Sequence, residues 1–348
     1  MNWLNDAIAT PCEQSLQTAL AQQQQLTKPP GSLGQLEQVA TTLASLQATP
    51  SPSVEHIHIT IFAADHGIAA QGVSAFPQAV TAEMVKNFAH GGAAIAVLAR
   101  HLNAKLQVCN VGTVNALEAI DGVLDCRLGD GSHDFSQQAA MSEQQLEQAL
   151  AVGKRQIDQA YEAGCDLFIG GEMGIANTTS ATALACALLQ LPVSELIGTG
   201  TGIDQNTLQH KQNIIEQALQ LHQLTQPTNP LECLRLVGGF EIAALTGAYL
   251  RAAQLGIPVL LDGFIASVAA LVALRFQPSI SPWFLLGHQS TELGHKMVVQ
   301  ALDKTPLLQL QMRLGEASGA ACAVPVLQLA CALHNEMATF DSAGVSTQ

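Results

Sequence analysis

The chain alternates short apolar runs with helical segments, and each run ends in glycine or in a cluster of small polar residues. Continuous apolar runs bounded by glycine are typical of parallel strands that are covered on both faces. Strands and helices in alternation form an open parallel α/β sheet. The six predicted strands are Ile57–Ala63, Leu106–Val111, Asp166–Ile169, Glu195–Ile197, Pro258–Leu261 and Trp283–Leu286.

Helical periodicity fills the intervals between these strands. Ser142 and Gln145 match a capping box, an amphipathic pattern follows them, and Gly164 is placed to end that helix. We therefore predict an α/β fold with a six-stranded, mainly parallel sheet and helices on both faces. The other predicted helices are Val80–Leu98, Thr178–Leu189, Thr207–Leu224, Glu241–Ala253 and Ile265–Leu274.

Both ends of the chain fall outside this alternation. The segments Glu13–Leu26 and 291–340 are helical by period, and we expect them to pair. This predicts a large α/β domain over residues 27–290 and a small helical domain made of residues 1–26 and 291–348.

The composition excludes several classes of function. The formal net charge is −14 and only 12% of residues are charged, so a surface that binds nucleic acid or anionic lipid is not expected. A hydrophobic content of 48% supplies a large core and leaves apolar surface for subunit interfaces. The sequence contains no uninterrupted apolar stretch of about 18 residues, so no membrane span is predicted. No leader pattern opens the chain and the cysteines form no Cys-x-x-Cys pair, so we expect a cytoplasmic protein without disulfides.

Three carboxylates follow apolar stretches and are flanked by glycine, namely Glu172, Asp262 and Glu316. Ligands of open α/β sheets bind outside the carboxyl ends of the strands, so we expect these acids to lie near the ligand. Glu316 precedes an almost wholly apolar helix. Its carboxylate could cap this helix, or partial desolvation could raise its pKa toward that of a general base.

A glycine-rich turn at 198–202 precedes a helix and suits an anion held by backbone N–H groups. It fails the dinucleotide-binding fingerprint, because Ile203 occupies a position that needs glycine. Lys211 in the next helix could add a charge to a bound phosphate, or it could be an ordinary solvated lysine. Another helix begins with three side chains that could bind phosphate or only cap the helix: Asn177, Thr178 and Thr179.

The histidines do not predict a metal site. His56 and His58 share a sheet face, but no third ligand has suitable spacing. His66 could touch a ligand or simply bond its neighbours. Neither a metal nor another cofactor is expected. A nucleotide-dependent oxidoreductase and a non-catalytic nucleotide- or base-binding protein stay open as hypotheses at this point.

Seven segments, taken together, are highly specific. They are Lys28–Gly34, Ala64–Gly67, Val80–Met84, Gly171–Thr179, Val237–Phe240, Leu260–Phe264 and Met312–Ala321. In this order, and over nearly the whole chain, they resemble the motifs of the nicotinate-nucleotide–dimethylbenzimidazole phosphoribosyltransferase family.

The resemblance implies transfer of the 5-phosphoribosyl group from nicotinate mononucleotide to 5,6-dimethylbenzimidazole. The products are α-ribazole 5′-phosphate and nicotinate, in the assembly of the cobalamin nucleotide loop. It also implies that Glu316 is the general base, that Glu172 lies in the same pocket and that Lys211 binds phosphate. By the same resemblance we expect a homodimer with a Rossmann-like large domain and a small helical domain that helps close the partner's site.

The residues fit such a reaction. Departure of a cationic pyridinium creates no new anion and needs no metal, and Glu316 can accept the proton that the attacking base loses. Glu172 could stabilise positive charge on the ribose. We expect phosphate and ribose to bind Gly174, Asn177, Thr178, Thr179, Gly202, Lys211 and Asp262.

An apolar wall is expected to receive the flat aromatic base. The predicted wall residues are Phe76, Met84, Met173 and Leu314. Phe76 and Met84 occupy positions where relatives can carry Ser and Gln. The choice among adenine, benzimidazole and phenolic acceptors therefore stays open.

Overall fold

The computed structural model describes residues 2–198, 200 and 202–346. Its strands are β1 (Ile57–Ala64), β2 (Lys105–Gly112), β3 (Val123–Asp125), β4 (Leu167–Met173), β5 (Val259–Leu261), β6 (Phe284–His288) and β7 (Pro306–Leu308). The α-helices of the first half are α1 (Glu13–Gln25), α2 (Gln35–Leu46), α3 (Ala79–Ala89), α4 (Ala94–His101), α5 (Glu143–Glu162), α6 (Asn177–Leu189) and α7 (Val193–Leu196). Those of the second half are α8 (Gln205–Leu221), α9 (Pro230–Val237), α10 (Phe240–Leu255), α11 (Phe264–Phe276), α12 (His295–Leu302), α13 (Ser318–Glu336) and α14 (Phe340–Ala343). Short 3₁₀ helices cover Asn2–Asn5, Gly67–Gln71 and Pro278–Trp283.

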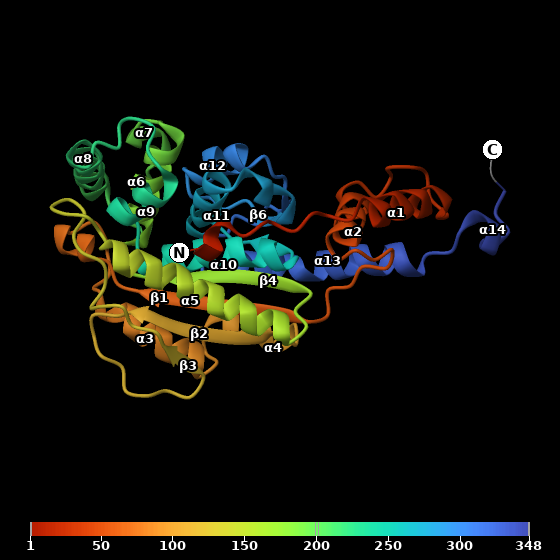
Figure 1. Cartoon of the computed structure of the whole chain (residues 1–348), viewed down its shortest axis with the longest axis horizontal. Coiled ribbons are helices and arrows are strands. Elements are labelled where there is room, and N and C mark those ends of the chain that lie inside the picture. Colours follow the sequence, from red (N-terminus) through yellow and green to blue (C-terminus); the bar gives the residue numbers. More distant parts are fainter. Residues whose placement is uncertain (1, 199, 201, 347–348) are drawn as a thin grey trace.

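Within the described residues, seven parallel strands form one sheet in the order β3-β2-β1-β4-β5-β6-β7. The chain winds outward from β1 to β3, returns beside β1 with β4, and winds the other way to β7. The strand order therefore reverses between β1 and β4, which is where ligands of open α/β sheets bind. Figure 1 shows α6–α9 at one end of the molecule and α1 and α2 at the other.

The α/β prediction is confirmed, but three details of it are wrong. Glu195–Ile197 is not a strand, because Val193–Leu196 forms a helical turn directly after Pro192. Two strands, β3 and β7, were not predicted. Each has three residues at a sheet edge, too short for an apolar run to stand out. The helix predicted over 80–98 is two helices, α3 and α4, separated by a turn at Gly91.

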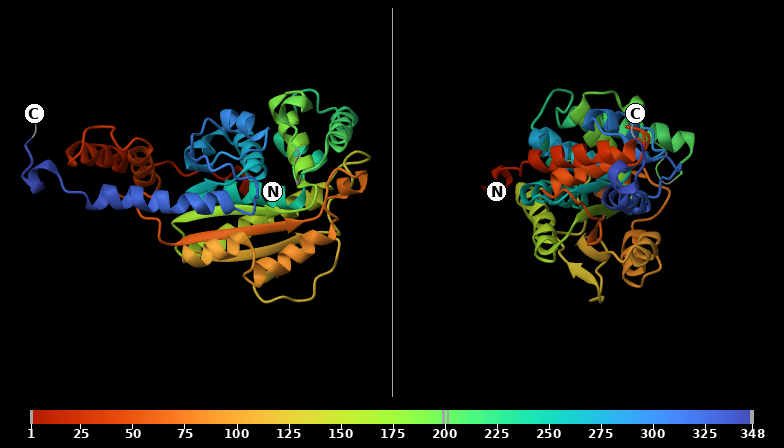
Figure 2. Two further views of the ribbon diagram at one scale, coloured as in Figure 1. Left: turned by 180° about the vertical axis from the view of Figure 1, so that it is seen from behind. Right: turned by 90° about the vertical axis from the view of Figure 1, so that its right-hand side faces the viewer.

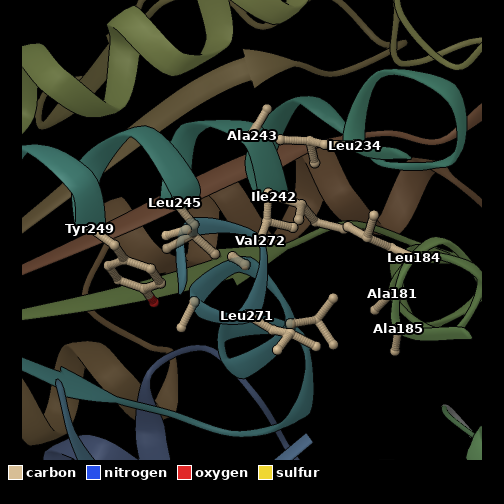
Figure 3. Packing of buried hydrophobic residues seen from close by; sticks show 14 of the residues in the cluster. Ala181, Leu184, Ala185, Leu234, Ile242, Ala243, Leu245, Tyr249, Leu271 and Val272 are labelled. Carbon is tan, nitrogen blue, oxygen red and sulfur yellow. The ribbon is translucent and has the colours of Figure 1, made fainter. Parts of the chain in front are cut away.

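Helices cover both faces of the sheet and enclose two cores. Along β1, Ile59 and Ile61 face one core, whereas Phe62 and Ala64 face the other, as the two-residue period of a strand requires. The first core is completed by α2, α3, α4 and α13, and the second by α5, α6, α10 and α11. Figure 3 shows part of the second core, where Leu245 of α10 lies beside side chains of α11. Among the helices that the structure describes, none is both long and apolar enough to span a membrane.

The two ends of the chain meet far from α6–α9. The amides of Gln22 and Gln23 in α1 bond the carbonyl and Nδ1 of His334 in α13 at 2.7 and 2.8 Å, and Leu26 pairs with Thr339. Figure 2 shows α1, α2 and the end of α13 extending together beyond the sheet. The strand β7, which lies between α1 and α13 in the sequence, pairs with β6 at the edge of the sheet. The division of the chain into domains at residues 27 and 290 stays a prediction.

Candidate active site

A cavity of about 490 Å³ lies at the carboxyl ends of β4, β5 and β6. The loop before α13 and the chain around residue 76 complete its wall. The cavity thus brings together segments from distant parts of the sequence. Nine predicted site residues line it: Phe76, Glu172, Met173, Gly174, Asn177, Thr178, Asp262, Leu314 and Glu316.

Glu172 lies near the end of β4 with its side chain buried. Its carboxylate accepts a hydrogen bond from Nδ2 of Asn177, at the start of α6. Burial, together with the charges of Glu241 and Asp262, raises the pKa of Glu172 to about 8. Glu172 therefore carries a proton at neutral pH and is placed to lose it when positive charge comes near.

Asp262 follows β5 and connects the sheet to α13. Its Oδ1 accepts a hydrogen bond of 2.8 Å from the backbone N–H of Ala320, in the first turn of that helix. Burial alone would raise the pKa of Asp262, but interactions with His288 and with the N–H groups of Ala320 and Gly263 outweigh burial and lower it. Asp262 is therefore an ionised cap that holds the helix next to the Glu316 loop.

Glu316 has a backbone that residues other than glycine seldom adopt. Its φ is +60°, and the φ of Gly315 and Ala317 on either side is +81° and +63°. Such conformations cost about 1–3 kcal/mol each in non-glycine residues and cluster at functional sites. The strained loop turns the Glu316 side chain into the cavity.

The carboxylate of Glu316 does not cap α13, so the prediction that it could cap this helix is wrong. The N-cap is Ala317, and in the part of the chain that the structure describes the Glu316 carboxylate has no hydrogen-bond partner, although the residue is only 7% exposed. Burial and the charge of Asp262 raise the pKa of Glu316 to about 7. A buried, unpaired carboxylate with this pKa has the properties of a general base at neutral pH.

Lys211, on α8, does not itself line the cavity but lies behind Thr178, which does. Its Nζ donates hydrogen bonds to Thr178 Oγ1 at 3.1 Å and to the carbonyl of Gly198 at 3.5 Å, and the residue is 1% exposed. Burial lowers the pKa of Lys211 to about 8 against the opposing charge of Glu292. Lys211 is therefore not a solvated lysine, and it lies beside Gly200 and Thr178, which both line the cavity.

Three other predicted residues do not line the cavity. Met84, on α3, packs against the core on that face of the sheet. Thr179 is fully buried, and within the described residues its hydroxyl has no partner. Gly202 is exposed, whereas residues 199 and 201 of the same turn lie outside the described residues.

His66 bonds its neighbours and does not line the cavity, which agrees with the second of its two alternatives. Its Nε2 lies 2.7 Å from Glu241 Oε1, and its Nδ1 lies 2.9 Å from Ser180 Oγ, with all three residues buried. This network links α6 and α10 through the ring of His66. Among the described residues, no group of three or more His, Cys, Asp or Glu side chains is placed to hold a metal ion.

Comparison with known proteins identifies the family. A family model described as "Phosphoribosyltransferase" matches residues 8–345. The chain is 55% identical over 345 residues to the nicotinate-nucleotide–dimethylbenzimidazole phosphoribosyltransferase of Xanthomonas oryzae pv. oryzae (strain PXO99A), with 99% of each chain covered. The chain belongs to this phosphoribosyltransferase family.

Two further relatives match nearly the full length of this chain. A protein of the same name from Pseudomonas putida (strain KT2440) is 55% identical over 344 residues, which is 99% of this chain and 98% of that protein. A crystal structure of a protein of that name from Thermus thermophilus is 39% identical, with a TM-score of 0.91 over 97% of this chain and 100% of the other. The oxidoreductase and the non-catalytic binding protein are therefore not favoured.

The cavity of this phosphoribosyltransferase also contains residues that were not predicted. His288 ends β6, Ser290 and Glu292 follow it, and Arg313 donates from Nη1 to the carbonyl of Gly200 at 3.4 Å. A signal for His288 and Ser290 was available, because both follow a predicted strand, and Arg313 lies in a matched motif. Glu292 had no such signal, because its position depends on how the chain turns after β6.

Proposed function

We propose that this phosphoribosyltransferase transfers the 5-phosphoribosyl group of nicotinate mononucleotide to 5,6-dimethylbenzimidazole or a related base. The products are α-ribazole 5′-phosphate and nicotinate, in cobalamin nucleotide-loop assembly. The observation that carries the proposal is the carboxylate of Glu316, which is buried, unpaired among the described residues and on one cavity wall with Glu172 and Asp262.

In this reaction one bond forms and one breaks at the anomeric carbon of the ribose. A nitrogen of the acceptor base attacks C1′ while the bond from C1′ to the nicotinate nitrogen breaks, and its electrons return to the pyridine ring. The N–H proton of the acceptor passes to Glu316. The leaving ring departs neutral at its nitrogen, so the chain need supply no acid there.

Two further acids stabilise the positive charge that develops on the ribose. Asp262 is ionised before substrate binds, because His288 and two backbone N–H groups lower its pKa. Glu172 begins protonated, since its pKa is about 8. A cationic substrate favours the ionised form of Glu172, so we infer that Glu172 loses its proton on the way to the transition state.

The phosphate of the donor is anchored near the start of α6, where Lys211 contacts Thr178. Lys211 supplies the cation, and Thr178 and Asn177 at the start of α6 supply polar groups and the positive end of a helix. We assign the same anchoring role to Gly174, Thr179 and Gly202, which lie before α6, in its first turn and before α8, respectively. Asp262 binds the ribose.

The acceptor base lies against apolar side chains. Phe76, Met173 and Leu314 line the cavity, and we infer that they contact the ring, with Met84 of α3 as a further residue of this wall. Phe76 and Leu314 are more than half exposed, so a flat aromatic ring would cover apolar surface that now faces solvent. This wall lacks base-specific hydrogen-bond donors, which leaves the identity of the acceptor to experiment.

The test is a direct assay. Purified protein is mixed with nicotinate mononucleotide and a series of acceptors comprising dimethylbenzimidazole, unsubstituted benzimidazole, adenine and a phenol, and nicotinate release is measured. We expect release that depends on the acceptor, with a phosphoribosylated base as the second product. Absence of release with every acceptor would reject the proposed function.

The pH dependence follows from Glu316. Its pKa is raised to about 7, and the base must be unprotonated to act. We therefore expect kcat/KM to fall by at least about tenfold per pH unit below about pH 7, and to fall again above about pH 8 as Lys211 loses its charge. Initial rates of nicotinate release over the pH range measure this limb. An acid limb near the ordinary glutamate pKa would contradict the assignment.

Gly315 leaves room for Glu172. A Cβ at this position would lie 2.6 Å from Glu172 Oε1, and the φ of +81° disfavours any side chain. We expect Gly315→Ala to displace Glu172 or the Glu316 loop and to lower kcat by on the order of 10²-fold. Gly164→Ala is the matched control, because Gly164 has a φ of +74° with open space around it, outside the cavity. Equal activity of the two variants would contradict the prediction.

We also propose that the protein is a cytoplasmic homodimer. The side chains of Leu293, Leu310 and Leu314 are apolar and exposed, and in the sequence each is at or within three residues of one that lines the cavity. Such exposed apolar surface favours contact with a second copy of the chain. Within the described residues the cysteines are all free, which suits a reducing compartment. Light scattering on the purified protein measures the oligomeric state, and a monomer at micromolar concentration would contradict the dimer.

A further inference from the structure

His288 is a buried polar residue on the cavity wall to which the proposed mechanism gives no contact with substrate. It ends β6, and its Nε2 lies 3.5 Å from Asp262 Oδ1, with both side chains only 3% exposed. Within the described residues, neither ring nitrogen makes a hydrogen bond that meets ordinary geometric limits. A buried imidazole with so few partners costs stability, and its one close charged neighbour is Asp262.

The first turn of α13 is shaped around this ring. A Cβ on Gly319 would lie 2.1 Å from Cδ2 and 2.2 Å from Nε2 of His288, so only glycine permits the helix to pack there. The same turn donates the Ala320 N–H to Asp262, and it begins two residues after Glu316. His288, Asp262 and the Glu316 loop are therefore packed as one unit.

Other titratable groups face Asp262 from every side. Carboxylates come from β4 and from the loop before α13, a phenol from α10, a second imidazole from α12 and a thiol from α13; they are Glu172, Glu316, Tyr249, His295 and Cys322. Glu241 of α10 adds to the negative charge around Glu172. A neutral Asp262 would lessen the electrostatic repulsion among these acids. Its ionised form therefore needs a stabilising interaction.

The second imidazole cannot do so. The Nε2 of His295 lies 3.0 Å from Ser267 Oγ, and its Nδ1 accepts from the backbone N–H of Ser290 at 2.9 Å. Burial and the neighbouring His288 lower the pKa of His295 to about 3, so it stays neutral. His288 is therefore the side chain left to interact with Asp262.

We propose that His288 is a positioning residue for catalysis: its ring N–H holds Asp262 in the ionised form, oriented toward the ribose. The proposal rests on the proposed function. Its effect extends to the base, because the negative charge of Asp262 contributes to the raised pKa of Glu316. Loss of His288 should thus change proton binding at the acidic cluster rather than remove a substrate contact.

Two substitutions separate this role from simple packing. His288→Leu keeps bulk but removes the N–H, whereas His288→Gln keeps an N–H near the position of Nε2. Without the N–H, burial raises the pKa of Asp262, so a second proton must leave before the enzyme is active. The ratio of kcat/KM of the Leu variant to wild type should fall by up to about tenfold per pH unit below the new pKa. The Gln variant should keep a nearly constant ratio.

A second measurement does not depend on activity. In wild type the pKa of Asp262 is below its ordinary 3.8, so this group stabilises the fold above that pH and loses the effect in acid. In the Leu variant we expect burial to dominate, so that the pKa of Asp262 rises above its ordinary value and the sign reverses. The loss of free energy of unfolding caused by His288→Leu should therefore grow as the pH rises from about 4 to 6.

The outcomes are distinguishable. If wild type releases no nicotinate, the proposed function fails, and the stability measurement still decides the role of His288. If wild type is active, a rate ratio for the Leu variant that does not change with pH would overturn the inference. Equal pH profiles of the Leu and Gln variants, or a loss of stability that is constant with pH, would overturn it as well.

Discussion

Replacing Glu316 by glutamine is expected to lower kcat for nicotinate release by about 10²–10⁴-fold. The amide keeps the size of the side chain but cannot accept the proton of the acceptor base. The Glu316 carboxylate has no hydrogen-bond partner among the described residues, so the change should disturb few contacts. We expect the KM for nicotinate mononucleotide to change little, because Glu316 acts on the other substrate.

Glu292→Gln is the matched control for this experiment. Glu292 also lines the cavity, and the same loss of charge there removes no proposed proton acceptor. The kcat of Glu292→Gln should stay within about tenfold of wild type. Loss of a general base would instead lower kcat by about 10²-fold or more. A Glu316→Gln variant with near-normal kcat, or one no worse than Glu292→Gln, would remove Glu316 from the role of base.

Replacing Lys211 by methionine is expected to separate binding from stability. A hydrogen bond between a charged group and phosphate is worth about 1.5–3 kcal/mol, so the KM for nicotinate mononucleotide should rise by about 10–10²-fold. Steady-state kinetics with the donor varied measure this effect. An unchanged KM would remove Lys211 from the phosphate site.

The same substitution should not weaken the fold. Burial lowers the pKa of Lys211 from 10.5 to about 8, so the charged lysine costs the folded state on the order of 3 kcal/mol at neutral pH. This cost is present below about pH 8 and disappears as the pH approaches 10.5, where the lysine is neutral in both states. Methionine has no such cost, so we expect the free energy of unfolding to stay constant or rise, as at other functional sites that trade stability for activity.

Lys304→Met is the matched control for Lys211→Met. Lys304 is also partly buried, and burial also lowers its pKa, but it lies between α2 and β7, away from the cavity. Its substitution should leave the KM for nicotinate mononucleotide unchanged. A similar rise in KM for both variants would show that the loss of any buried lysine impairs binding, and the specific role of Lys211 would fail.

Local signals explain which elements could be predicted. The apolar run of β1 and the capping box at Ser142 depend on neighbours a few residues apart, and both are present in the structure. The strand predicted over 195–197 is absent because Val193–Leu196 forms a helical turn. A run of three residues is too short to distinguish a strand from a helix. The edge strand β7 has no local signal, since it exists only because β6 lies beside it.

By itself, the sequence determined the chemical groups of the site. Glu172, Asp262 and Glu316 each follow an apolar stretch beside glycine, and that pattern is local. Only the tertiary structure decided that Asp262 caps α13, that His288 lies against Asp262, and that Lys211 reaches Thr178. Strand order and helix packing set these contacts between residues far apart in the chain. The protonation of a buried acid depends on every charge around it in space, and neighbours in sequence supply only a few of those charges.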